Sequence, residues 1–174
     1  MSPLYATGRT DLLFNFDINT ESNFFLGSGQ LDGGGVPPNF FSDLNVRRGF
    51  SHCLDPVLFT ELVLYGESIA NNGVIPPPLL GYNPEQETHD FNQELCAEEL
   101  SLAWEGQLPA VGFRLQVPFV SADRAQEVAL ANLQANLQAV NPAYRLETVG
   151  LPPDRKSTRL NSSHSQQSRM PSSA

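Results

Sequence analysis

Lysine is missing from the first 153 residues of this 174-residue chain, which carry six arginines against eighteen acidic residues, a formal charge of −12. Nucleic acids and anionic membrane surfaces would repel a chain this acidic. Long apolar runs are also missing, since none approaches the roughly 20 residues that a membrane-spanning helix needs. The composition therefore argues against nucleic acid as a partner, and we expect no direct membrane span.

Cysteine is scarce, with Cys53 and Cys96 as its two occurrences. Two cysteines are too few for a disulfide scaffold, and both fall on the apolar faces of expected helices. We therefore expect them to be buried as free thiols. The residues before Asp11 have neither the basic start nor the apolar stretch of a secretory signal, so we expect no export signal in the chain as given.

Residues for catalysis are few. A hydrolytic triad needs a nucleophile, a histidine and an orienting acid, yet residues 1–153 contain only His52 and His89 as histidines. His52 adjoins Cys53 on an expected helix, where neighbouring side chains point about 100° apart and so do not form a pair. No zinc-finger or HExxH spacing is present. We expect no enzyme, no metal site and no cofactor.

The end of the chain differs in composition from the rest. Residues 154–174 hold four basic residues, one acid and seven serines, with almost no apolar residue to bury. The segment resembles translated adaptor or vector sequence. We expect one domain over residues 1–153, followed by a disordered, artefactual tail over residues 154–174.

Two short helices are expected to meet in an elbow. Asp43 can cap the first of them, whose apolar residues recur at helical spacing: Val46, Phe50 and Cys53. Asp55 can cap the second, which opens with Pro56. Its expected buried residues are Leu58, Phe59, Leu62 and Val63. Arg47 and Arg48 lie off the first apolar face, where they can bind an anion or, as we prefer, pair with local acids such as Asp43 or Asp55 on the surface.

A strand, a helix and a strand are expected in the second half. Residues 113–119 alternate with a period of two, and residues 143–149 form a second such strand. Between them lies a helix that Ser121 can cap, with an inner stripe of Leu130, Leu133, Leu137 and Val140. Short links favour a parallel crossover, so the predicted fold is α/β, a mixed sheet with flanking helices.

Other elements are expected earlier in the chain. Residues 11–17 are a strand candidate, although their alternation is imperfect, and residues 18–38 form a loop. A helix is expected from about Asn92 to Trp104, with Trp104 packed in the core. Residues 71–84 form a proline-rich connection.

The turn after the first strand is the predicted ligand-binding site, with Phe119, Ser121 and Asp123 as its residues. Open α/β sheets bind ligands beyond the carboxyl ends of their strands, and the N–H groups of a following helix favour an anionic group. The alternative is that Ser121 and Asp123 only cap the helix.

Residues 27–55, GSGQLDGGGVPPNFFSDLNVRRGFSHCLD, resemble the signature region of the family 5 extracellular solute-binding proteins, the dipeptide and oligopeptide receptors of bacterial ABC importers. The positions that carry this resemblance are Gly29, Leu31, Asp32, Gly33, Pro38, Phe40, Phe41, Val46, Arg47, Arg48, Phe50 and Asp55. The connection at residues 73–84 is similar to a proline-rich loop of the family. The later strand and long helix are similar too.

The resemblance implies a type II periplasmic-binding-protein fold, of which residues 1–153 would be an internal piece, mostly of the second lobe. It implies a receptor that binds peptides or other small solutes outside the cytoplasm and delivers them to an ABC permease. It does not identify the solute, and the family's ligand-pairing aspartate lies beyond this chain. We expect the piece not to bind peptides by itself. A free-standing α/β interaction module and an α/β enzyme remain as alternatives.

Overall fold

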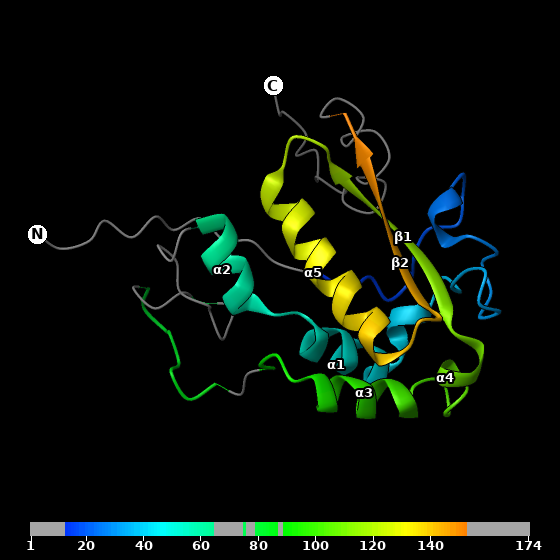
Figure 1. The fold of residues 1–174 in the computed structure, drawn as a ribbon, viewed down its shortest axis with the longest axis horizontal. Helices are drawn as coiled ribbons and strands as arrows, with labels where there is room; N and C mark the ends of the chain where they lie inside the picture. Colours follow the sequence, from blue (N-terminus) through cyan, green and yellow to red (C-terminus); the bar gives the residue numbers. More distant parts are fainter. Residues whose placement is uncertain (1–12, 65–74, 76–78, 87–88, 153–174) are drawn as a thin grey trace, which may run out of the picture.

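A computed structural model of the chain describes residues 13–64, 75, 79–86 and 89–152. Figure 1 shows two strands crossed by a long helix, with shorter helices packed beneath. In chain order the elements are η1 Phe24–Leu26, η2 Phe40–Ser42, α1 Leu44–Cys53, α2 Pro56–Leu64, α3 Gln93–Leu102, α4 Leu108–Val111, β1 Phe113–Val120, α5 Arg124–Val140 and β2 Tyr144–Leu151. None of these helices is both long and apolar enough to cross a membrane.

The sheet of the described residues consists of β1 and β2, which run parallel in a register that pairs Phe113 with Tyr144 and Val120 with Leu151. α5 connects the two strands and covers one face of the sheet (Figure 1). The expected α/β class and the expected parallel crossover between these strands are therefore confirmed. Leu130, Leu133 and Leu137 are buried as predicted, and Val140 packs half-buried at the edge of the core.

The cap of α5 differs from the expectation. Asp123, not Ser121, is the N-cap, and its carboxylate accepts a hydrogen bond from the Gln126 N–H at 3.1 Å. Ser121 lies two residues too early and instead donates its hydroxyl to the Leu151 carbonyl at 3.2 Å. The turn between β1 and α5 is therefore tied both to the helix and to the end of β2.

The expectation of free thiols is wrong, because Cys53 and Cys96 form a disulfide. α1 and α3 pack side by side and bring the two Cα atoms to 5.3 Å, within the range that disulfides span. Both residues are fully buried. Helical periodicity placed each cysteine on an apolar face correctly, but a separation of 43 residues gave no sign that the two faces meet.

Aromatic side chains fill the core beneath the amino ends of the strands. The Phe50 ring of α1 lies 5.7 Å from that of Phe113, which in turn stacks on Tyr144 at 5.1 Å. Trp104 stacks on Phe40 at 6.4 Å, so its predicted core packing is confirmed. Asp43 caps α1 as predicted, and its second oxygen accepts a hydrogen bond from the Trp104 N–H at 2.7 Å.

Amide side chains of α5 hold the elbow between α1 and α2. Asn132 accepts a hydrogen bond from the Asp55 N–H at 2.9 Å, and Asn136 donates to the Cys53 carbonyl at 2.8 Å. Asp55 caps α2 as predicted, through the Val57 N–H at 2.9 Å. α5, which is distant in sequence from α1 and α2, therefore fixes the connection between these two consecutive helices.

Two further expectations are wrong. Residues 13–17 form no strand, because the Asn15 side chain accepts a hydrogen bond from the Asp17 N–H and turns the chain locally. Leu58 is 37% exposed on α2 rather than buried. The side chains of Phe59, Leu62 and Val63 lie outside the described residues. So do residues 153–174, residues 11 and 12 of the expected strand, and half of the proline-rich connection, at residues 71–74 and 76–78.

Candidate functional site

The predicted site lies at the carboxyl end of β1, beside the arrowhead in Figure 1. The N–H and the hydroxyl of Ser121 both donate hydrogen bonds to the Leu151 carbonyl, at 3.0 and 3.2 Å. Asp123 is engaged as the cap of α5, and the Phe119 side chain is half-buried. The structure thus brings the three residues together in one turn, in which both polar side chains have structural partners.

Two backbone donors remain at this turn. Within the described part of the chain, the N–H groups of Arg124 and Ala125 have no hydrogen-bond acceptor. They open a helix of 17 residues, so they also lie at the positive end of its dipole. Donors of this kind can bind a carboxylate or a phosphate. The chemistry that the turn offers therefore comes from the backbone rather than from the predicted side chains.

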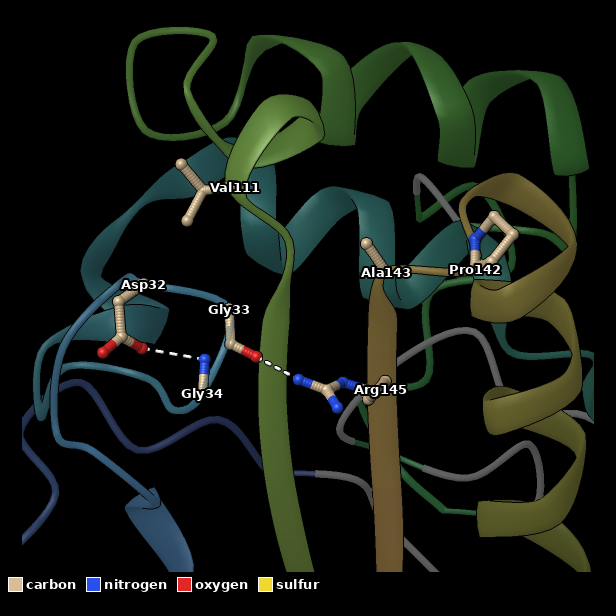
Figure 2. Close-up of a pocket in the computed structure, with 7 residues that line it drawn as sticks. All are labelled: Asp32, Gly33, Gly34, Val111, Pro142, Ala143 and Arg145. Carbon is tan, nitrogen blue, oxygen red and sulfur yellow. Dashed lines mark hydrogen bonds between the residues drawn. The ribbon is translucent and has the colours of Figure 1, made fainter.

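The opposite end of the sheet carries a pocket of about 500 Å³. Figure 2 shows it between the loop at residues 32–35, called the glycine loop below, the end of α4 and the start of β2. Its lining residues are Asp32, Gly33, Gly34, Val111, Pro142, Ala143 and Arg145. Sequence patterns did not point to this pocket, since they predicted only a loop over residues 18–38.

Both charged side chains of this pocket hold the glycine loop. Asp32 accepts hydrogen bonds from the Ser28 hydroxyl at 2.7 Å and from the Gly34 N–H at 2.8 Å, and these bonds lower the pKa of its carboxyl group. Arg145 reaches from β2 and donates to the Gly33 carbonyl (Figure 2). The pocket is therefore best described as the junction where the loop is fixed to the sheet.

The outer face of the sheet carries an ion pair between neighbouring strands. Arg114 donates two hydrogen bonds to the Glu147 carboxylate, at 2.8 and 2.7 Å, and Gln116 adds a third at 3.0 Å. The bonds from Arg114 and Gln116 lower the pKa of Glu147 to about 2. Sequence alternation placed Arg114 and Glu147 on outward positions, but only the register shows that they meet.

The two arginines of the motif have structural partners. Arg47 donates to the carbonyls of Phe41 and Ser42, at 2.7 and 2.9 Å, and packs over the Phe16 ring. Arg48 pairs with Glu99 of α3 at 3.8 Å. Arg48 thus pairs with an acidic side chain, as preferred, but the partner is Glu99 and not Asp43 or Asp55, whose carboxylates cap α1 and α2.

Solved structures include chains similar to this one, and two of them are NikA and NikZ. NikA from Brucella suis, in complex with Fe(III)-EDTA, matches 65% of this chain and 24% of its own with 18% identity and a TM-score of 0.51. NikZ from Campylobacter jejuni, in complex with Ni(L-His), matches 67% of this chain and 24% of its own with 16% identity and a TM-score of 0.49.

The likeness to NikA shows the fold, which is that of part of a protein of the periplasmic-binding-protein type. The present chain spans about a quarter of the length of NikA. No protein-family model matches the sequence, and no curated protein matches it either.

Proposed function

We propose that this chain is part of the solute-binding component of an ABC importer, of the family 5 type, which binds a peptide or similar small solute and delivers it to a permease. The observation that carries the proposal is the fold shared with NikA. The motif that resembles the family supports it, because its residues Phe40, Phe41, Val46 and Phe50 are buried in one cluster.

We further propose that residues 1–153 are a piece of a longer receptor and belong mostly to its second lobe. Its span of about a quarter of NikA supports this. A cleft between two lobes needs both lobes, so the piece binds peptides too weakly for transport. In this account residues 154–174 do not belong to the receptor.

The solute contacts the turn after β1, at Phe119, Ser121 and Asp123. Support comes from the N–H groups of Arg124 and Ala125, which have no acceptor in the described part of the chain. An anionic group of the solute, such as a carboxylate, would accept from them. The receptor does no bond chemistry and needs no cofactor.

The receptor works outside the cytoplasm, in the periplasm or an equivalent compartment. The buried disulfide between Cys53 and Cys96 supports this, since disulfides persist in oxidising compartments and are rare in the cytosol. Its partners are then the permease subunits of the importer, and the described helices supply no membrane span of their own.

Long-read sequencing of the source gene tests the proposal. We expect the reading frame to leave the present sequence near residue 153, to continue to receptor length, and to begin with an export signal. Genes for a permease and an ATPase should lie beside it. A stop codon directly after residue 174, with no transport gene nearby, would contradict both the receptor and the fragment.

The purified 174-residue chain gives a second test. Calorimetric titration with di- and tripeptides should show no binding in the micromolar range, because half of the cleft is missing. Micromolar binding would mean that this chain is a complete binding module.

A further inference from the structure

Two histidines meet on the surface at the end of α1. His52 lies in the last turn of α1, and His89 lies in the segment that leads to α3. Their ring centroids are 5.2 Å apart and the ring planes are perpendicular. His89 is exposed and His52 is partly exposed, so both rings are accessible to solvent.

Hydrogen bonds between His52 and the residues that follow His89 bring the two histidines together. His52 Nδ1 lies 2.9 Å from the Asp90 carbonyl, and the Asn92 N–H donates to the His52 carbonyl at 2.9 Å. A carbonyl oxygen only accepts, so Nδ1 carries the proton. In the neutral ring Nε2 then has a free lone pair. Metal-binding histidines have this same arrangement, with the other ring nitrogen donating to a carbonyl or carboxylate.

The ring separation fits a shared metal ion. Zinc–nitrogen distances of about 2.0–2.1 Å and a tetrahedral angle place the centroids of two ligating imidazoles about 5 Å apart. The observed 5.2 Å agrees with this separation. A shared ion requires the exposed His89 ring to turn until its lone pair points at the same place as that of His52.

The electrostatic setting favours a cation at this place. The carboxyl end of a helix carries the negative end of its dipole, and His52 lies in the last turn of α1. Residues 1–153 also have a formal charge of −12, which attracts divalent ions over a longer range.

We propose that His52 and His89 form a two-histidine site for a divalent metal ion of the borderline class, Zn²⁺, Ni²⁺ or Cu²⁺, which prefer imidazole nitrogen. Within the described residues no third histidine, cysteine or carboxylate completes a cluster with them. The remaining coordination positions are open to water or to a ligand from outside the chain. The site fixes the connection before α3 to the end of α1, and it does not depend on the proposed transport function.

Proton NMR of the 174-residue chain with Cu²⁺ far below one equivalent tests which histidines bind. The third histidine of the chain, His164, serves as an internal reference. We expect the ring signals of His52 and His89 to broaden together, and before that of His164. Broadening of all three at the same Cu²⁺ concentration, or of one of the pair alone, would overturn the proposal.

Titration calorimetry with Zn²⁺ alone gives the affinity. We expect one ion per chain, and a loss of at least about tenfold in affinity for His89→Gln and for His52→Gln. His164→Gln is the matched control and should bind as the wild type does. His89 is exposed, so its variant keeps the fold even if His52→Gln does not. An affinity of His89→Gln within twofold of the wild type would mean that the two rings only make an edge-to-face contact.

Discussion

The two ends of the parallel sheet differ in burial. At the amino end Phe113 and Tyr144 are at most 1% exposed, beneath the aromatic cluster and the disulfide-linked pair of α1 and α3. Beyond Leu115 in β1 and Leu146 in β2, no residue of either strand is buried. The two paired strands therefore lie in the core at their amino ends and at the surface at their carboxyl ends.

This difference leads us to expect that the amino end of the sheet contributes mainly to stability and the carboxyl end to the proposed binding. In the amino-end pocket the side chains of Asp32 and Arg145 form hydrogen bonds that hold the glycine loop. Substitutions there should therefore lower the free energy of unfolding. The carboxyl end keeps two backbone donors without an acceptor in the described residues, and few buried contacts restrain it. Binding sites are often formed by such less restrained segments on a rigid support.

Removal of the disulfide should have the largest effect on the amino end. Cys53→Ala with Cys96→Ala opens a loop of 43 residues, and chain entropy predicts a loss of about 4 kcal/mol in the free energy of unfolding. Urea unfolding of the double variant and of the oxidised wild type measures it. Equal midpoints and slopes for the two proteins would mean that the disulfide contributes nothing.

A matched pair of glycines compares the two ends directly. Gly112 has a φ of +72°, and a Cβ there would lie 2.6 Å from the Ala143 carbonyl oxygen. Gly112→Ala should therefore cost at least about 2 kcal/mol of unfolding free energy. At Gly150 a Cβ would meet only side-chain carbons, the nearest being Ser121 Cβ at 3.3 Å. Gly150→Ala should stay within about 1 kcal/mol of the wild type.

Thermal and urea unfolding of the two variants provide the comparison. A larger loss for Gly150→Ala than for Gly112→Ala would reverse the assignment of the rigid end.

The ion pair in the middle of the sheet should have the smallest effect. The pKa of Glu147 is lowered to about 2 by Arg114 and Gln116, so its stabilisation is complete above the unfolded pKa near 4.5 and is lost as the pH falls toward 2. Because its side chain is 38% exposed, solvent screening limits the effect to about 1 kcal/mol.

Unfolding free energies between pH 2 and 6 measure this contribution, with Glu147→Gln as the control. The wild type should lose about 1 kcal/mol more than the variant over the acid range. Parallel curves for the two proteins would show that the pair contributes nothing to folding.

Local patterns predicted the elements better than they predicted the contacts between them. The period of two at residues 113–119 and the leucine stripe of α5 gave the strand–helix–strand unit correctly. Asp43 and Asp55 were correctly identified as caps, because a cap acts on its own helix within three residues.

Long-range contacts could not be predicted in this way. Three contacts join segments that are distant in sequence: the Cys53–Cys96 disulfide, the hydrogen bond from Asn136 to the Cys53 carbonyl, and the ion pair of Arg114 with Glu147. Periodicity shows which face of an element is apolar, but not which element meets it. The strand expected at residues 11–17 failed for the opposite reason, since Asn15 offered a local hydrogen bond.

The measurement that tests the proposed binding site most directly uses the longer receptor that we propose this chain to belong to. Arg124→Pro removes one N–H at the first position of α5, where proline is well tolerated, and Arg124→Ala keeps that N–H while it removes the same side chain. Dipeptides and tripeptides are titrated by calorimetry, and both variants are compared on the peptide that binds best.

We expect Arg124→Pro to bind that peptide about tenfold or more weakly than Arg124→Ala, because a hydrogen bond to a charged group contributes about 1.5–3 kcal/mol. Affinities within twofold of each other would show that the solute does not contact the carboxyl end of the sheet.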